Sequence, residues 1–276
     1  MGTLLANYHT HNHLCNHAVG TVSDYVKKAI SLKMKEIGIS DHNPTPINFM
    51  DKEKYYSSKT YRHMKLDEFY SVYLEELKEA KELYSNKIKI YSGLECEYIK
   101  KRHDYFKMLR DELDYMVLGM HFYVKGRKSF DTYEDVTYKN VMDYAKACVD
   151  GMRSGLFTIM AHPDVFMCGY KDKNDERKFD KYAMKASKLI IEEAIKNDMY
   201  LEININGLRF TRKHGSDEWF YPCLDFWKLV ANYKDAKIVF GIDCHDPEFM
   251  ESEDIDKVKE FAKSLNLNVL DFIELK

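Results

Sequence analysis

Helical segments and short apolar segments alternate along almost the whole of this 276-residue chain. The first helical segment, residues 21–37, opens with Thr21 and Asp24 in the spacing of a capping box and is expected to end at Gly38. A short buried strand, "IGIS", follows it. The same order recurs: helical segments lie at 66–84, 104–113, 138–155, 181–198, 224–233 and 254–265, and strands follow at 87–95, 115–121, 157–162, 199–205, 237–243 and 268–275.

Strands separated by helices pair in parallel, and the helices then cover the sheet. Because seven or eight such units can close a sheet on itself, the pattern predicts an α/β barrel, with an open doubly wound sheet as the alternative. A chain of this length that is 45% hydrophobic can bury one full core, so we expect a single domain over 1–276. Longer irregular stretches should form insertions on one rim, at 43–65, 123–137, 168–180 and 206–222.

Composition narrows the possible partners. The formal net charge of −3 gives no global positive field for nucleic acid or an anionic membrane, so a small-molecule partner is expected. No apolar run is long enough to span a membrane, and the N-terminus lacks a signal-peptide pattern, which favours a cytoplasmic protein. The six cysteines contain no CxxC pair, which favours reduced thiols. The sequence does not indicate an oligomeric state.

Histidines and carboxylates gather at the C-terminal ends of the predicted strands. In a barrel these ends share one face, where loops converge and ligands bind. Residues two apart in a strand point to the same side, so His9 and His11 can hold one ion, and Asp243 with His245 repeats that spacing. Because buried charges are costly unless paired or bound to metal, the pattern indicates a metal site. Its candidate residues are His9, His11, Asp41, His42, Glu95, His121, His162, Asp243 and His245.

Imidazole and carboxylate ligands without a thiolate cluster suit zinc, manganese or iron in a catalytic site. Asp41 is expected to accept a hydrogen bond that orients an imidazole, with direct ligation or proton transfer as open alternatives. Glu97, two residues after Glu95, has a similar claim. The remaining histidines follow no strand and are expected at the surface or in supporting positions: His13, His63, His103 and His214.

The motifs resemble those of the PHP (polymerase and histidinol phosphatase) family of phosphoesterases. They run in the same order, from "HTHNHLCNH" through "ISDHNP", "GLECEY", "GMHF" and "AHPD" to "GIDCH". The resemblance implies a distorted (β/α)7 barrel with three divalent transition metals, reported in the family as zinc, iron or manganese. It also implies that Glu95 bridges the first and second ions. The implied ligands are His9, His11 and Asp243 at the first site, His121 and His162 at the second, and His17, His42 and His245 at the third.

Within the family, the chain resembles the stand-alone histidinol-phosphate phosphatases in its length, in a helical insertion over 51–84, and in its end just after the last strand. The resemblance implies hydrolysis of L-histidinol phosphate in histidine biosynthesis, by attack of a metal-bridging hydroxide on phosphorus. A phosphatase also needs cations to hold the phosphoryl oxygens, and Arg209 is our first candidate, with Lys171 as the second.

Other functions remain open at this point. The same site could act on another phosphate ester, or on nucleic acid as an exonuclease, although the net charge of −3 disfavours the latter. An amidohydrolase-type enzyme would favour a lysine on the fourth strand, and "YMVLGMH" has none. A metal-binding protein without catalysis is the last alternative, and it predicts no turnover of any phosphate ester.

Overall fold

The computed structural model describes residues 1–44, 63–126 and 128–275. Its strands form two parallel sheets and one antiparallel hairpin, in the orders β1-β2-β3, β11-β10-β9-β8-β5-β4 and β6-β7. The predicted α/β fold with parallel strands is therefore confirmed. The strands are β1 (Ala6–Asn7), β2 (Glu36–Ile39), β3 (Lys89–Ser92), β4 (Glu95–Cys96), β5 (Val117–Leu118), β6 (Phe122–Lys125), β7 (Lys128–Asp131), β8 (Ile159–Met160), β9 (Tyr200–Asn204), β10 (Lys237–Gly241) and β11 (Val269–Leu270).

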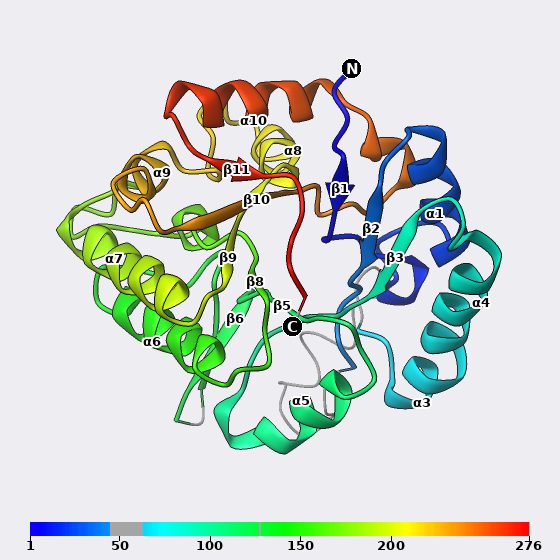
Figure 1. Ribbon diagram of the computed structural model, residues 1–276. Coiled ribbons are helices and arrows are strands. Elements are labelled where there is room, and N and C mark those ends of the chain that lie inside the picture. The colour runs from blue at the N-terminus through cyan, green and yellow to red at the C-terminus, as the bar shows by residue number, and fades with distance from the viewer. Residues whose placement is uncertain (45–62, 127, 276) are drawn as a thin grey trace.

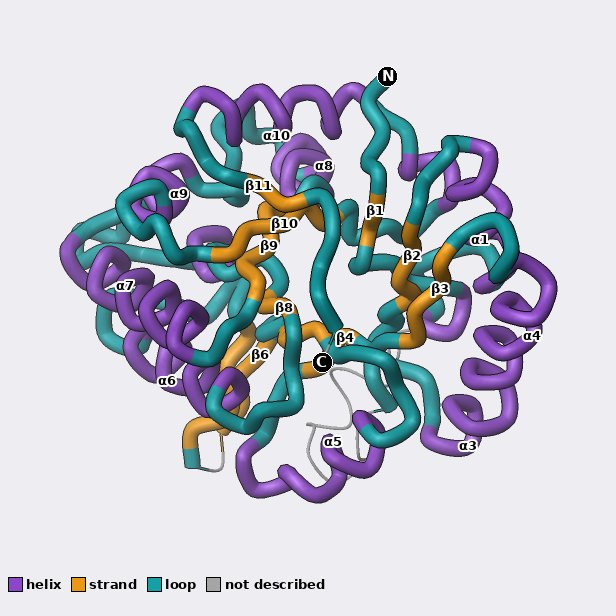
Figure 2. Tube along the Cα trace, viewed as in Figure 1, coloured by secondary structure: helices purple, strands orange, loops and turns teal. Residues whose placement is uncertain are grey.

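The helices lie around the outside of the strands (Figure 1). The tube coloured by secondary structure gives the same arrangement, with strands at the centre and helices at the periphery (Figure 2). Most of the helices bury one apolar stripe against the sheets, which is why their helical periodicity was visible in the sequence. The helices are α1 (Val22–Ser31), α3 (Leu66–Glu68), α4 (Leu74–Tyr84), α5 (His103–Arg110), α6 (Val141–Met152), α7 (Lys181–Lys196), α8 (Asn206–Lys213), α9 (Leu224–Val230) and α10 (Glu253–Ser264).

Two isolated parallel bridges join the two parallel sheets just beyond the regular strands. One pairs Thr10, after β1, with Cys244, after β10, and the other pairs His42, after β2, with Glu95 in β4. Cys244 also exchanges two backbone hydrogen bonds with residues 9–11, of 3.1 and 2.9 Å. The chain segments that carry the predicted ligands are therefore held side by side by backbone hydrogen bonds.

The first helix is shorter than predicted. The sequence pattern placed its end at Gly38, whereas α1 ends at Ser31. Lys33 adopts a left-handed φ of +59°, and the N–H of Met34 bonds to the carbonyl of Ala29, which closes the helix. The apolar stripe continued past this point only because the residues of β2 are also buried. The capping box of Thr21 with Asp24 is present as predicted.

Two of the stretches predicted to be irregular contain regular structure. Residues 206–222 begin with α8, and most of the β6-β7 hairpin lies within residues 123–137. The sequence of α8 has few apolar residues, so its helical period was not evident. Residues 45–62, within the predicted insertions 43–65 and 51–84, lie outside the described residues. From residue 66 to residue 84 the chain is helical, with one π-helical turn at Phe69–Tyr73 between α3 and α4.

The C-terminal segment runs from β11 to the centre of the view, between the strands of the two parallel sheets (Figure 1). Ile273 packs in a buried cluster with Ala6, Tyr8, Tyr115 and residues of four further strands, and its N–H donates to the Tyr8 hydroxyl at 3.3 Å. The N–H of Glu274 donates to the hydroxyl of Tyr200, at the start of β9. The interior is thus a packed core, closed at the end where the strands begin.

All six cysteines are free thiols, as the absence of a CxxC pair predicted. Among the described residues, no helix combines the length and the apolar character that a membrane span requires.

Gly38 in β2 is needed for the packing of this core. A Cβ at residue 38 would lie 2.2 Å from the hydroxyl oxygen of Tyr115, which is fully buried and donates to the carbonyl of Tyr8 at 2.6 Å. We expect Gly38→Ala to lower the free energy of unfolding by about 1–3 kcal/mol, because the ring must move within a dense core. Urea unfolding followed by circular dichroism measures this loss.

The double variant Gly38→Ala/Tyr115→Phe lacks the oxygen that would clash. It should be less destabilised than the sum of the two single variants, because the substitutions share one contact. A Gly38→Ala protein as stable as the wild type would contradict this account of the core.

Candidate active site

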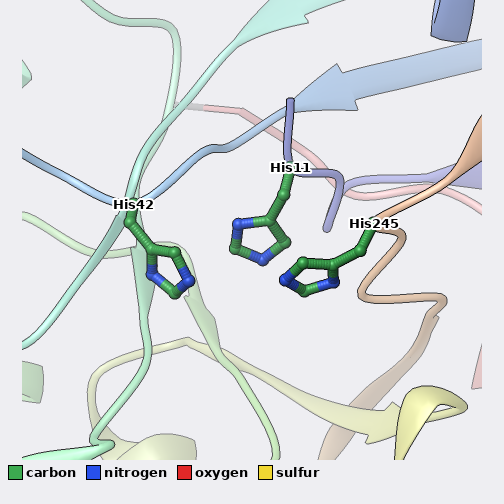
Figure 3. Close-up of side chains that lie close together, drawn as sticks. All are labelled: His11, His42 and His245. Carbon is green, nitrogen blue, oxygen red and sulfur yellow. The ribbon is translucent and has the colours of Figure 1, made fainter. Parts of the chain in front are cut away.

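The structure brings the predicted metal ligands together at the C-terminal ends of the strands. In Figure 3 the imidazoles of His11, His42 and His245 point toward one another from three different segments. Each member of such a group offers a ligand atom within 4.8 Å of the others. Further groups of this kind are His9 with His162 and Asp243, and His9 with His11 and Glu95.

Glu95 lies at the centre of the cluster and is 1% exposed. Its Oε1 atom lies 3.0 Å from Nε2 of His162, and 3.4 Å from Nε2 of both His9 and His121. Its Oε2 atom lies 3.3 Å from Nδ1 of His42 and 3.5 Å from Nε2 of His11. The two oxygens therefore face different sets of histidines, so one carboxylate can serve ions held by different sets.

Imidazole nitrogens in this cluster face one another in pairs. Two neutral imidazoles that meet through their lone pairs repel, so a proton or a cation has to lie between them. A divalent cation between such nitrogens would replace the protons and bind all the converging lone pairs. The Nε2 pairs are His9 with His11 at 3.1 Å, His121 with His162 at 3.2 Å, and His17 with His245 at 3.0 Å.

In five of these six rings the other nitrogen, Nδ1, lies within hydrogen-bond distance of an oxygen acceptor, whereas Nδ1 of His162 has no hydrogen-bond partner among the described residues. When Nδ1 donates its proton there, the lone pair is on Nε2, which points into the cluster. Asp41 takes this supporting position, although it orients His11 and not its neighbour His42, and Glu97 does the same for His121. The contacts are His9 to Glu202 (2.8 Å), His11 to Asp41 (3.3 Å), His17 to the Cys15 carbonyl (2.8 Å), His121 to Glu97 (2.8 Å) and His245 to the Asp243 carbonyl (3.0 Å).

Burial and neighbouring carboxylates act in opposite directions on the histidine pKa values. Burial lowers the pKa of His11, but the hydrogen bond with Asp243 and other acidic contacts outweigh it and raise the pKa to about 9. Glu95 has the same effect on His121, whose pKa also rises to about 9 despite its burial. Burial, together with the positive charge of His11, lowers the pKa of His17 to about 4. Protons thus occupy part of the metal-free cluster at neutral pH.

Two candidate ligands adopt backbone conformations that L-residues rarely take. His162, after β8, has a φ of +28°, and Asp243, after β10, has a φ of +52°. Such conformations cost about 1–3 kcal/mol each and persist only where the surroundings fix them. For Asp243 the fixing contacts include the side-chain amides of Asn204 and Asn206, which both donate to Oδ2 at 3.3 Å. The surroundings therefore hold both candidate ligands in a strained backbone conformation.

A cavity of about 550 Å³ opens onto the cluster. One wall consists of candidate ligands, and the other consists largely of one face of α8. Four α8 residues line it at the spacing i, i+3, i+4 and i+7, which is one side of a helix: Asn206, Arg209, Phe210 and Lys213. Tyr133, Tyr221 and Phe249 complete the aromatic part of the lining.

Arg209, the first candidate for holding phosphate, lies in this cavity. Its guanidinium carbon is 3.5 Å from the ring centroid of Phe249, and its Nε is 3.9 Å from the carboxylate of Asp254. Lys171, the second candidate, is exposed and is not among the described residues that line the cavity. Its backbone pairs with residues 136–138. The structure therefore brings Arg209, and not Lys171, to the candidate ligands.

The four remaining histidines are not among the described residues that line the cavity. His63 is buried and stacks on His42 with ring centroids 5.1 Å apart, and its Nδ1 lies 3.0 Å from the carbonyl oxygen of Asn43. The ring of His63 therefore packs against the ring of His42. The other three lie near other acceptors: His13 is 3.8 Å from the Glu76 carboxylate, His103 is 3.0 Å from the Tyr98 hydroxyl, and His214 is 2.8 Å from the Phe210 carbonyl.

A model of the PHP domain family matches residues 7–206. The chain belongs to the PHP domain family. A probable histidinol-phosphatase of Deinococcus radiodurans is 25% identical over 94% of this chain and 93% of its own length. A histidinol-phosphatase of Bacillus subtilis is 26% identical over 86% of this chain and 92% of its own.

The fold also has a solved counterpart. The crystal structure of a histidinol phosphate phosphatase from Lactococcus lactis, in complex with zinc, L-histidinol and phosphate, superposes with a TM-score of 0.67 at 19% identity. The match covers 96% of this chain and 95% of that one. At this identity the likeness concerns the PHP fold.

Sequence reasoning missed several residues of this PHP site. Glu202, in the middle of β9, lies 2.8 Å from Nδ1 of His9 and accepts the backbone N–H of His162 at 3.0 Å. A carboxylate within the apolar strand "YLEIN" was the available signal, since a buried charge needs a partner. Gly241 of β10 makes room for it, because a Cβ there would lie 1.5 Å from Oε1 of Glu202. Lys213 could have been found from its spacing to Arg209 once α8 was recognised.

Metal binding to this PHP site should release protons. His11 and His121, with pKa values of about 9 in the metal-free chain, are protonated at pH 7 and must lose those protons to bind a metal. Titration calorimetry with zinc in two buffers of different ionisation enthalpy should show about two protons released at pH 7 from these groups. The number should fall as the pH rises through 9, and the affinity should fall as the pH decreases. A proton release of zero at pH 7 would contradict the assignment.

Proposed function

We propose that this chain is a metal-dependent phosphomonoesterase that hydrolyses L-histidinol phosphate to L-histidinol and phosphate. The observation that carries the proposal is the cavity that Glu95, Asp243 and histidines line together with the two cations Arg209 and Lys213. A phosphate dianion requires divalent ions on one side and cationic hydrogen-bond donors around its oxygens. The choice of substrate is supported by the names of the two relatives, which align with most of this chain.

We also propose that residues 1–276 form one domain and that the two parallel sheets make up one distorted seven-stranded barrel. Only Gly93 and Leu94 separate β3 from β4, so these count as one bent strand. The ring then runs through β1, β2, β3 with β4, β5, β8, β9 and β10, with β11 outside it. The bridges of Thr10 with Cys244 and of His42 with Glu95 support closure, because each joins one sheet to the other.

The residues of the cluster fit divalent transition metals. The facing Nε2 pairs demand positive charge between them, and Oε2 of Glu95 is buried and accepts no hydrogen bond from the described residues. The mixture of imidazole and carboxylate suits zinc, manganese or iron. We propose three ions, with Glu95 shared by the first two: His9, His11 and Asp243 would hold the first, His121 and His162 the second, and His17, His42 and His245 the third.

The ions, when bound, lower the pKa of water and neutralise charge on phosphoryl oxygens. Arg209 would donate two charge-assisted hydrogen bonds to the phosphoryl group from the opposite wall, with Lys213 one helical turn further along α8. Asp41 would act through His11, whose ring it orients at 3.3 Å. In this proposal Asp41 positions a ligand and takes no proton from the substrate.

Hydrolysis by the purified chain tests the proposal directly. Release of inorganic phosphate should be measured from L-histidinol phosphate and from an aryl phosphate, and release of nucleotides should be measured from single-stranded DNA. We expect release of phosphate from histidinol phosphate that a chelator abolishes and that zinc, manganese or iron restores. Glu95→Gln serves as an inactive control, because the first and second proposed ions share that carboxylate. Release from DNA alone would favour a nuclease, and a metal-loaded protein without any turnover would favour a binding protein.

Replacing Arg209 should weaken the hold on the phosphoryl group without loss of metal. We expect Arg209→Ala to lower kcat/KM for histidinol phosphate by about 2–4 kcal/mol, or on the order of thirty- to a thousand-fold, because a charged partner is lost in a partly desolvated site. Arg209→Lys should stay closer to alanine than to wild type, since an ammonium lacks the planar fork.

Arg212→Ala is the matched control, because Arg212 lies on the same helix, pairs with Asp254 and is not among the described lining residues. The aryl phosphate should be affected as strongly as histidinol phosphate by Arg209→Ala. A loss seen only with histidinol phosphate would mean that Arg209 binds the organic group, and wild-type rates with both esters would exclude any role in substrate binding.

A further inference from the structure

Two tyrosines line the cavity and have no part in the proposal above. Tyr133 follows the β6-β7 hairpin, and Tyr221 lies between α8 and α9. Tyr221 is 1% exposed. Among the described residues that line the cavity, these two are the ones that carry hydroxyl groups. They are therefore the available neutral O–H donors on this surface.

Both rings lie against one pair of candidate ligands. The ring of Tyr133 is parallel to the imidazole of His121, with an interplanar angle of 6° and centroids 6.0 Å apart. The ring of Tyr221 meets the imidazole of His162 edge to face, with centroids 6.2 Å apart. Since His121 and His162 both contact Oε1 of Glu95, the two phenols lie at the end of the cavity that would hold the metals.

The ring of Phe210 packs against both tyrosines, with ring centroids 5.2 Å from Tyr133 and 5.9 Å from Tyr221. Each phenol carries one O–H proton that it can donate to a ligand. The ordinary pKa of a tyrosine is about 10, so both phenols are neutral donors at neutral pH. A neutral donor can bind an anionic oxygen without adding a cation beside the metals.

We propose that the hydroxyls of Tyr133 and Tyr221 donate hydrogen bonds to non-bridging oxygens of the phosphoryl group. An ester has to present its phosphoryl group to the metal end of the cavity, and that is where the two rings lie. Hydrogen bonds to charged oxygens in a desolvated site are among the stronger ones in proteins. The inference rests on the proposed function in that the ligand is a phosphate ester, and it does not depend on which organic group the ester carries.

Binding of inorganic phosphate to the zinc-loaded chain tests the proposal, because this ion has no organic group and undergoes no turnover. Titration calorimetry should compare wild type with Tyr133→Phe, Tyr221→Phe and the double variant, each of which keeps the rings. We expect each single variant to bind phosphate about 10- to 100-fold more weakly, as the loss of one hydrogen bond to a charged group implies. The double variant should bind phosphate more weakly than either single variant, because it lacks both donors.

Tyr144→Phe is the matched control, since Tyr144 is fully buried on α6 and is not among the described residues that line the cavity. It should bind phosphate as the wild type does. Zinc content, measured by atomic spectroscopy, should be equal in all variants. A loss of zinc in the Tyr133 or Tyr221 variants would overturn the proposal, because the tyrosines would then support the ligands and not the phosphate.

Wild-type phosphate affinity in the variants would also overturn it, as would a wild-type chain that binds no phosphate. Loss of histidinol phosphate turnover with unchanged phosphate binding would assign the pair to the organic group instead. The proposed function fails separately, if wild type binds phosphate but does not hydrolyse histidinol phosphate. In that case weaker phosphate binding by the variants would still support the role of the tyrosines.

Discussion

The site depends on lone pairs that converge among closely packed imidazoles and carboxylates. Imidazoles of His9 and His11, and of His121 and His162, meet through Nε2 atoms 3.1 and 3.2 Å apart. Such contacts are repulsive unless positive charge lies between the nitrogens, so the buried cluster is stable only when it holds protons or cations. The pKa values of His11 and His121 are raised, so protons supply this positive charge in the metal-free cluster. Metal ions supply it when they bind, and protons and metal ions therefore compete for the same nitrogens.

The ring nitrogens can stay this close together only if the backbone segments that carry them are held in place. The bridge between Thr10 and Cys244 sets two ligand-bearing segments in parallel register, and that between His42 and Glu95 does the same for two others. Acceptors behind the rings add a second constraint, since Asp41, Glu97 and Glu202 each face an Nδ1 atom. The positive φ values of His162 and Asp243 show that the fold tolerates local strain to keep these side chains in place.

The sequence predicted that these histidines and carboxylates come together, and it could do so because their signal is local. A polar residue just after an apolar strand falls on the same face as every other such residue, whatever the details of packing. Glu202 and α8 were missed for the opposite reason. The role of Glu202 appears only in the folded chain, where its carboxylate meets the ring of His9. The helix α8 has few apolar residues, so its helical period was not evident. The early end of α1 was missed because buried positions continue from the helix into β2.

The two walls of the cavity come from different parts of the architecture. The candidate ligands follow strands whose backbone is fixed by neighbouring strands, whereas the opposite wall comes from α8, the hairpin segment with Tyr133 and the segment with Tyr221. Of α8, only Asn206 falls within the residues that match the family model, although Asp243 and His245 also lie beyond them. Residues such as Arg209 and Lys213 project from a helix surface and make no contribution to strand pairing. They can therefore be replaced without disturbing the ligand cluster, so the hold on the phosphoryl group can be altered separately from the metal site.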